Sequence, residues 1–410
     1  MAAESPDAAP VLTPATIADQ EAGPVERFRR RVTEGELGSL PVIAGLVIIW
    51  ITFQILNPNF LSARNLTNLI VQIADMGTIA VGIVLVLLLG EIDLSVGSVS
   101  GLGAGVMGVL QVKHGVPALI AVPAGVLTGT LVGLLQGFWF TRFKVPSFVV
   151  TLAGLLAWEG LLILILGTTG TINLFDPGID AIAGNFVSPA GGWIIAAVGL
   201  LLFLGGMLRT RQRRARAGLE TRPIAGLLFR AATASVLVLA AVYILNSDRG
   251  TPYALLILLG LVIGFDYITR RTRFGRHIFA VGGNAEAARR AGISVTFIRM
   301  AVFTLAGTLA ATGGIIAASR LLAVNQSSGS GDVLLNAIAA AVIGGTSLFG
   351  GRGTVWAALT GSLVIGSIQN GMDLLALSAA IRFMVIGAVL LVAVTVDAIA
   401  RQGRASAGRA

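Results

Sequence analysis

The sequence has no cysteine and only two histidines, His114 and His277, among its 410 residues. The lack of cysteine excludes disulfides, iron–sulfur ligation and thiol catalysis, and two histidines without ligand-like spacing argue against a metal site. No Gly-x-x-x-x-Gly-Lys-Ser/Thr segment occurs either, so the chain carries no phosphate-cradling loop for ATP hydrolysis. Paired carboxylates and nucleophile–base spacings are also missing from the apolar segments. We therefore expect no cofactor, no metal and no enzymatic activity in this chain.

Charged residues make up only 12% of the sequence, whereas 55% of it is hydrophobic. This balance is typical of integral membrane proteins rather than of soluble domains. The 53 glycines fit the same class, because small residues let helices approach closely within a bilayer. The net charge of +9 does not indicate a nucleic-acid partner, because the basic residues form short clusters between apolar runs without interleaved aromatics.

Apolar runs divide the chain into about twelve segments, each approaching the roughly 20 residues that a membrane-spanning helix needs. The sequence therefore predicts an all-α fold, a polytopic transmembrane helical bundle with about twelve spans. The predicted segments are Pro41–Leu56, Leu66–Leu89, Leu94–Val112, Val116–Phe138, Phe148–Leu166, Trp193–Met207, Ile224–Leu245, Tyr253–Ile268, Ile298–Ala318, Val333–Leu348, Val355–Met372 and Ala380–Ala398.

Two polar tails flank this transmembrane domain, which we place at residues 39–399. Residues 1–38 are rich in Ala, Pro, Glu and Asp and lack the apolar core and cleavage site of a signal peptide. We therefore expect them to form a disordered cytoplasmic tail. Residues 400–410 are expected to form a second cytoplasmic tail.

The basic residues indicate the orientation of the spans. If the N-terminus is cytoplasmic and the spans alternate, all but five of the 29 Lys and Arg lie on the cytoplasmic side. This asymmetry is the positive-inside pattern, and an odd number of spans would destroy it. The dense run from Arg209 to Arg222 is interpreted as an anchor on anionic lipid headgroups, with a regulatory docking site as the alternative. The exceptions are Arg64, Lys113, Arg249, Arg320 and Arg382.

The least apolar part of the domain is a predicted cytoplasmic loop at residues 270–297. Within it, Asn284 can cap a short helix that Gly292 ends. A short helix between two spans is typical of an element that couples to a partner. A solvated surface helix without a partner is an equal alternative.

Two glycine-rich segments, Leu87–Gly105 and Ala341–Met372, join short apolar runs. Glycine-interrupted segments in both halves of a membrane transport protein point to broken helices along a solute path. For any single glycine, a tight turn between helices is the alternative. Both segments contain a Gly-x-x-x-Leu-x-x-Gly spacing, at Gly90/Leu94/Gly97 and at Gly344/Leu348/Gly351.

Polar residues inside the predicted spans are candidates for contact with a polar solute. Asp75 lies well inside its span, near Gln72, and an ionisable residue at that depth rarely faces lipid. An interhelical hydrogen bond is the structural alternative. Glu91 and Asp93 fall at a span end, where we expect solvent to reach them. Weaker candidates inside spans are Trp158, Glu159, Gln369 and Asn370.

Three motifs occur in order along the chain: IDLSVGS at Ile92–Ser98, GGN-x-x-AA-x-x-x-GI at Gly282–Ile293, and GGTSLFGGRGT at Gly344–Thr354. Together they resemble the ribose/xylose-type permeases of the binding-protein-dependent ATP-binding cassette (ABC) importers, over residues 40–398. The positions of the first and third motifs that carry the resemblance are Ile92, Asp93, Leu94, Ser95, Gly97, Gly344, Gly345, Gly350 and Gly351.

The resemblance implies a permease subunit that moves a monosaccharide across the bacterial inner membrane by alternating access. It also implies three partners: a separate ATPase subunit, an extracytoplasmic sugar-binding protein and a second permease copy, which would form a homodimer. Residues 192–245 resemble a helix pair inserted in xylose-type permeases, which favours D-xylose over ribose. The loop that couples to the ATPase would then contain Gly283, Asn284, Ala287, Ala288 and Gly292.

An ion-coupled secondary transporter of a small polar solute is the alternative, because such proteins have a similar number of spans. That class requires a relay of buried acidic and basic residues. Here the buried acids are few, and no buried His or Lys is predicted beside them. Genes for an ATPase and a secreted sugar-binding protein next to this one would decide between the two classes.

Overall fold

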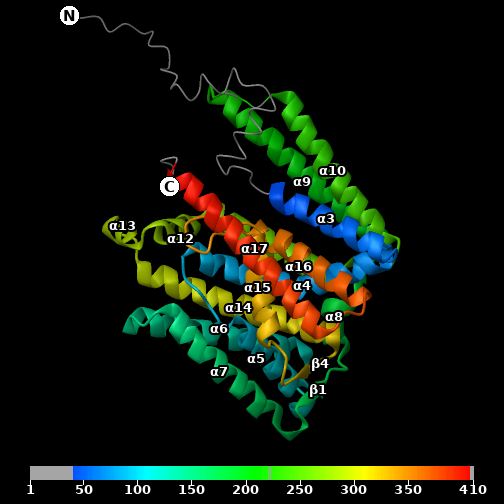
Figure 1. Ribbon diagram of the computed structural model, residues 1–410, viewed down its shortest axis with the longest axis vertical. Coiled ribbons are helices and arrows are strands. Elements are labelled where there is room, and N and C mark those ends of the chain that lie inside the picture. Colours follow the sequence, from blue (N-terminus) through cyan, green and yellow to red (C-terminus); the bar gives the residue numbers. More distant parts are fainter. Residues whose placement is uncertain (1–39, 220, 222, 407–410) are drawn as a thin grey trace, which may run out of the picture.

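The computed structural model describes residues 40–219, 221 and 223–406, and these residues form a bundle of helices (Figure 1). The predicted tail at residues 1–38 lies outside the described residues, as does the end of the tail at 400–410. In chain order the elements are α3 (Leu40–Leu56), α4 (Ala63–Leu88), α5 (Val96–Gly108), η1 (Val109–Lys113), α6 (Ala118–Phe143), α7 (Ser147–Leu166), η2 (Gly167–Thr169), β1 (Thr171–Asn173), α8 (Pro177–Gly184), β2 (Phe186–Val187), α9 (Pro189–Arg216), α10 (Ile224–Asn246), β3 (Thr251–Pro252), α11 (Tyr253–Arg271), α12 (Arg273–Gly283), α13 (Ala285–Arg290), α14 (Val295–Leu321), β4 (Ala323–Asn325), α15 (Gly331–Ile343), α16 (Trp356–Leu374) and α17 (Ala379–Ser406).

Seven of the described helices are long and apolar enough to cross a membrane, namely α4, α6, α7, α9, α10, α11 and α14. The predicted all-α membrane fold is therefore confirmed. The remaining predicted segments coincide with α3, α5, α15, α16 and α17, which do not meet that criterion over the described residues. The only strands in the described part of the chain form two short antiparallel pairs, β1 with β4 and β2 with β3.

The centre of the bundle is α4, which is buried along almost its whole length and packs against α14, α16 and α15. From Ile79 to Leu88 its sequence is apolar on all sides, as is usual for a helix enclosed by other helices, whereas its first half carries polar residues such as Gln72 and Asp75. The Ser62 side chain caps its first turn by accepting a hydrogen bond from the Asn65 backbone N–H. A helix enclosed in this way can present a polar side chain only to another helix or to a cavity.

Glycines bring α6 and α14 into backbone contact. A methyl group on Gly133 would lie 2.2 Å from the Phe303 carbonyl oxygen, and one on Gly129 would lie 2.3 Å from that of Gly307. No side chain fits into such a gap, so only glycine permits this approach. The prediction that glycine serves helix packing is confirmed at this contact.

The helices α9 and α10 pack against each other at the edge of the bundle (Figure 1). Only Leu245 is buried on α10, and only Gly192 and Ala196 are buried on α9. The β2–β3 ladder and a hydrogen bond from Asn246 Nδ2 to the Pro189 carbonyl join the two helices to each other at one end. At the same end, Arg249 Nη2, just after α10, donates to Asn68 Oδ1 on α4. Its origin as an insertion stays a prediction.

The polar segment at residues 270–297 contains more structure than the sequence predicted. The short helix α13 was expected, and Asn284 caps it as predicted by accepting a hydrogen bond from the Ala287 N–H at 2.9 Å. The preceding α12 was not expected. Its apolar residues Ile278 and Val281 are buried, but they belong to a run of only four apolar residues that follows Arg276 and His277, so no long apolar run marks the helix.

Both α5 and α15 are short helices. Each has 13 residues, which corresponds to about 20 Å of helix, less than the roughly 30 Å of a bilayer core. The chain before α15 packs against α5, since a methyl group on Gly101 would lie 2.0 Å from the Ser328 carbonyl oxygen. The glycine-rich chain before α15 therefore lies directly on α5.

Candidate functional site

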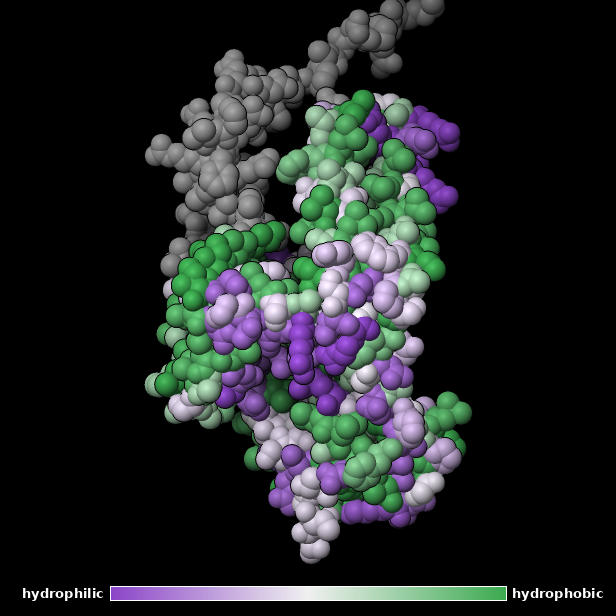
Figure 2. Space-filling view, turned by 90° about the vertical axis from the view of Figure 1, so that its right-hand side faces the viewer, coloured by the Kyte–Doolittle hydropathy of each residue, from purple (hydrophilic) through white to green (hydrophobic). Residues whose placement is uncertain are grey.

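A cavity of about 560 Å³ opens at the end of the bundle that carries α8, β1 and β4. Figure 2 shows this end, where hydrophilic side chains gather around a hollow and apolar side chains lie above and below it. The walls come from α4, α5, α14, α15, α16 and α17 and from the segment between β4 and α15. A cavity of this size is within the range of roughly 300–1,000 Å³ that is usual for small-molecule sites.

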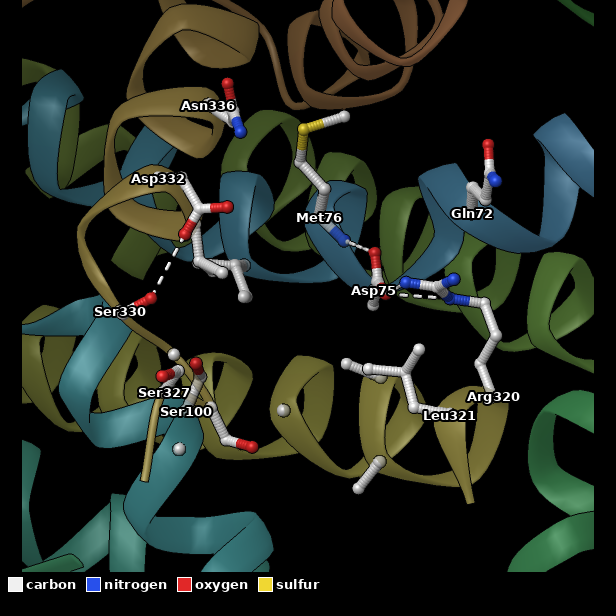
Figure 3. A pocket seen from close by; sticks show the side chains of 18 of the residues that line it. Gln72, Asp75, Met76, Ser100, Arg320, Leu321, Ser327, Ser330, Asp332 and Asn336 are labelled. Carbon is white, nitrogen blue, oxygen red and sulfur yellow. Dashed lines mark hydrogen bonds and ion pairs between the residues drawn. The ribbon is translucent and has the colours of Figure 1, made fainter. Parts of the chain in front are cut away.

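An ion pair between Asp75 and Arg320 crosses one side of the cavity (Figure 3). Asp75 lies in the middle of α4 and is only 8% exposed. The Arg320 Nη2 and Nε atoms lie 3.2 and 3.3 Å from its Oδ2 atom. Because an isolated carboxylate at this depth is costly, the guanidinium is what permits Asp75 to be ionised here.

The sequence predicted Asp75 as a site residue but treated Arg320 only as a basic residue at the extracytoplasmic end of a span. In the structure, Arg320 is in the last turn of α14 and its side chain reaches back to Asp75. Side chains on a helix tilt toward its N-terminus, so a basic residue in the last turn can point into the bundle.

A second ion pair, between Asp373 and Arg382, also lines the cavity. Arg382 Nε additionally donates a hydrogen bond to the Leu377 carbonyl oxygen at 2.8 Å. The remaining charged residue of the wall is Asp332, which accepts a hydrogen bond from Ser330 Oγ at 3.2 Å and has no basic partner among the described residues. Both arginines of the wall are thus neutralised by carboxylates, and one carboxylate is in excess.

The amide side chains among the predicted candidates fall into two positions. Gln72 and Gln369 line the cavity. Asn370 lies behind the wall, where its Nδ2 donates to Gln72 Oε1 at 3.3 Å and its Oδ1 accepts from Asn65 Nδ2 at 2.7 Å. Asn370 therefore orients Gln72 rather than facing the cavity itself.

Trp158 and Glu159 do not belong to this cavity. They lie on α7, and neither contributes to its wall. The Trp158 Nε1 atom is buried without a hydrogen-bond partner, close to the Gln136 side chain that approaches Gly154. The structure thus brings together only part of the predicted set. The sequence missed Arg320, Asp332, Asn336 and Arg382 as wall residues.

At the opposite end of the bundle, the second and third sequence motifs meet the end of α4 and Gly90, directly before the first motif. The Gly351 N–H donates to the Leu88 carbonyl at 2.9 Å, and a methyl group on Gly282 would lie 1.8 Å from the same oxygen. A methyl group on Gly350 would lie 2.9 Å from Gly90. We call this contact of Gly90, Gly282, Gly350 and Gly351 the glycine junction. It explains physically why these motifs are rich in glycine, since backbone touches backbone there.

Next to the glycine junction, α13 presents an exposed surface. Of the predicted coupling residues, Ala288 is buried, whereas Gly283, Asn284, Ala287 and Gly292 are exposed. Gly292 has a φ of +81°, a left-handed conformation that favours glycine after a helix, and so ends α13 as expected. Four exposed positions beside a buried alanine form a face that a partner can reach.

Glu91 and Asp93 are not solvated, and that prediction was wrong. Asp93 is buried and accepts hydrogen bonds from both the backbone N–H and the Oγ of Ser95. Ser95 Oγ also lies 3.0 Å from Gln136 Oε1 on α6. Glu91 pairs with Arg299 instead of water. The neighbouring helices α6, α7 and α14 cover the segment between α4 and α5, which the sequence could not reveal.

The rest of the first motif holds this segment in place. The Leu94 N–H lies 3.1 Å from Thr151 Oγ1 on α7, and a methyl group on Gly97 would lie 2.6 Å from the Gly329 carbonyl oxygen. Ile92, in contrast, is exposed. In the third motif, a methyl group on Gly344 would lie 2.0 Å from the Ala357 carbonyl oxygen, so Gly344 closes α15 against α16. Gly345 follows with a positive φ.

Comparison with known proteins gives consistent results. A family model described as "Branched-chain amino acid transport system / permease component" matches residues 65–394. The chain is 41% identical over 357 residues to the xylose transport system permease protein XylH of Escherichia coli (strain K12), which covers 87% of this chain and 90% of that protein. No solved structure matches the chain.

Two further relatives extend the comparison. XylH of Haemophilus influenzae is 38% identical over 338 residues, which covers 82% of this chain and 90% of that protein. The ribose import permease protein RbsC of Bacillus subtilis (strain 168) is 32% identical over 365 residues, which covers 89% of this chain and 94% of that protein. The similarity therefore extends over nearly the whole length of each relative.

Proposed function

The chain belongs to the family of branched-chain amino acid transport system permease components, and from that membership we propose that it is the permease subunit of an ABC importer for a monosaccharide, D-xylose. It is a multi-pass protein of the bacterial inner (plasma) membrane. Like the permeases it resembles, it is a transport component and not an enzyme. A separate ATPase subunit and an extracytoplasmic binding protein are the partners that this family implies.

The charge of the cavity favours a sugar over an amino acid, and this observation carries the choice of substrate. A zwitterionic amino acid brings an ammonium group, which Asp332 could bind, and also a carboxylate, which needs an unpaired cation to bind it. Arg320 and Arg382 are both already paired with aspartates in the wall, and Asp332 would repel the carboxylate. A neutral, hydroxyl-rich solute meets no such obstacle. Among sugars, the relatives then favour xylose. The two that are 41% and 38% identical are named as xylose permeases, and the one that is 32% identical is named as a ribose permease.

The cavity is proposed to be the extracytoplasmic part of the solute path. Gln72, Asp75 and Gln369 would contact the sugar, with Asn370 holding Gln72 in position. Apolar wall residues such as Met76 and Ile79 offer a surface for the ring of the sugar. Polar groups that fix orientation within a largely apolar wall are the usual design of such sites.

We place the termini in the cytoplasm and count about twelve spans, including the short helices. In this orientation α13 and the glycine junction face the cytoplasm, where an ATPase would bind, and the cavity faces the opposite side. The exposed residues Gly283, Asn284, Ala287 and Gly292 would contact the ATPase. A second copy of the chain would complete the importer, and the arginines that end α9 would contact anionic lipid headgroups.

The ion-coupled secondary transporter gains only limited support from the structure. The buried pair of Asp75 and Arg320 resembles one step of a charge relay. Arginine, however, does not release its proton in proteins, so this pair cannot pass a proton along. A paired acid and base in the wall therefore favours a structural or sugar-binding role.

Uptake by proteoliposomes tests the proposal. The chain would be reconstituted with its ATPase subunit, supplied with the binding protein, and offered labelled D-xylose, D-ribose or leucine. We expect ATP-dependent uptake of xylose, slower uptake of ribose and none of leucine. Uptake that follows a proton or sodium gradient without the ATPase would establish the alternative class instead.

A further inference from the structure

The helix α15 carries two polar side chains that the proposed function has not used. Asp332 and Asn336 are four residues apart, so they lie on the same face of the helix, and both line the cavity (Figure 3). They point from α15 toward the space between it and α4, where Met76 stands opposite. Neither residue was singled out by its sequence context.

Asn336 is buried, with only 5% of its surface exposed, and its Oδ1 atom has no hydrogen-bond partner. Buried amide groups are normally paired, because leaving one unpaired is costly. A side chain with a purely structural role would have been expected to find a partner within the bundle. Rotation about its last torsion, which is soft in asparagine, can turn either end of the amide to the cavity.

Asp332 also has free hydrogen-bonding capacity. Its only hydrogen bond is with Ser330, and it has no basic partner in the described part of the chain. It lies in the first turn of α15, where the side chain of the cap residue Ser330 accepts no hydrogen bond from a backbone N–H of the helix. The backbone N–H groups of that turn therefore have no side-chain cap.

Several other polar groups of the wall are occupied. Asp75 is paired with Arg320, and Asp373 with Arg382. Ser100 Oγ donates to the Gly97 carbonyl at 2.6 Å, and the oxygen of the Gln72 amide accepts from Asn370. Asp332 and Asn336 thus hold free hydrogen-bonding capacity on α15, and across the cavity Gln369 and the Gln72 Nε2 atom also have no hydrogen-bond partner among the described residues.

We propose that Asp332 and Asn336 form a subsite that binds two neighbouring hydroxyl groups of a monosaccharide. This inference rests on the proposed function and adds the residues that recognise the sugar. The carboxylate of Asp332 accepts from one hydroxyl, and the amide of Asn336 exchanges a hydrogen bond with the next. The apolar ring face packs against Met76 on the opposite wall.

The test measures ATP-dependent uptake of xylose and its singly deoxygenated analogues at concentrations that saturate the binding protein. The variants are Asn336→Leu, which removes the amide at similar size, and Asp332→Asn, which removes the charge. Leu335→Ala is the matched control, because Leu335 lies on the same helix but is exposed outside the cavity. We expect the maximal rate for xylose to fall about tenfold in both variants, equivalent to the loss of a hydrogen bond, and to stay unchanged in the control.

The analogues separate recognition from a merely structural effect. In the wild type, removal of the hydroxyl bound by Asn336 should slow uptake about tenfold, whereas in Asn336→Leu that analogue and xylose should move at the same rate. Uniform slowing of all analogues, or unchanged rates in both variants, overturns the subsite. If Asn336→Leu does not accumulate in the membrane, the same comparison of xylose with its deoxygenated analogues is made in Asp332→Asn alone. A wild-type importer that moves no monosaccharide contradicts the proposed function instead.

Discussion

Glu91 and Arg299 form an ion pair with 2.7 Å between Oε1 and Nη2. Glu91 belongs to the segment before α5, and Arg299 lies in the second turn of α14, directly after the polar segment with α13. Ser147 Oγ on α7 also donates to Glu91 at 2.7 Å, and the Arg299 guanidinium lies over the Phe140 ring on α6. One ion pair therefore connects four parts of the bundle close to the proposed ATPase surface.

Breaking this ion pair should reduce the coupling of ATP hydrolysis to transport. We expect Glu91→Gln and Arg299→Gln each to lower the amount of sugar moved per ATP several-fold, because movement of α14 would no longer reach α5. Proteoliposomes in which both uptake and phosphate release are followed give this ratio. The double variant Glu91→Arg/Arg299→Glu, which reverses the ion pair, should restore part of the ratio of sugar moved to ATP hydrolysed. Arg142→Gln, an exposed basic residue at the end of α6, is the control, and equal loss there would remove the specific role of the pair.

The glycine junction predicts different effects for two adjacent glycines. Gly282→Ala should destabilise the protein, because its methyl group would lie 1.8 Å from the Leu88 carbonyl oxygen and the backbone cannot move aside cheaply. A cost of about 1–3 kcal/mol is usual for such overpacking. Gly283→Ala has no atom within 4 Å of the added group and serves as the control. Thermal unfolding in detergent measures both, and equal melting temperatures would contradict the close contact.

The ion pair of Asp75 and Arg320 predicts that its single variants are worse than the double variant. Arg320→Met leaves the buried Asp75 carboxylate without a partner and should abolish most uptake. Asp75→Asn leaves the less buried Arg320 unpaired and should be milder. The double variant should recover accumulation in the membrane above that of Arg320→Met. Uptake of sugar at the wild-type rate in Asp75→Asn would reduce Asp75 to a scaffold residue.

Gly292 tests the surface proposed to contact the ATPase. Gly292→Asp should leave membrane insertion intact, because aspartate tolerates the left-handed conformation better than most residues. The added charge on the exposed face of α13 should weaken ATPase binding and uncouple transport. Gly292→Asn, which is neutral and accepts the same conformation, is the control. Co-purification of the ATPase measures binding, and undiminished binding and uptake in Gly292→Asp would exclude this surface.

The sequence predicted those parts of the fold that depend on local composition. Continuous apolar runs marked each long helix, since a helix that faces lipid or other helices must be apolar throughout. The helix α12 was missed because its apolar run, Ile278–Val281, is only four residues long, and α8 because it lies in a polar loop. The pairing of β1 with β4 joins residues far apart in the chain and could not be predicted from either strand.

In the candidate site too, the sequence predicted what local composition shows and missed what depends on contacts between distant segments. Asp75 could be predicted, because a charge within an apolar run is visible in the sequence. Its partner Arg320 could not, because it lies at a helix end where solvation is the ordinary expectation. Glu91 and Asp93 were wrongly expected to be solvated, since only the folded chain shows that α6, α7 and α14 cover them. Asn336 looked like any polar residue near the start of a helix.

The helix α15 begins in the wall of the cavity and ends at Gly344 and Gly345, a few residues before the glycine junction. It is a single rigid element that belongs to both ends of the protein. If α15 shifts when the junction closes, thermodynamic linkage requires that closure change the affinity for sugar by the same factor as sugar changes the ease of closure. The rate of ATP hydrolysis would then depend on whether sugar occupies the cavity, and a permease without sugar would support less hydrolysis.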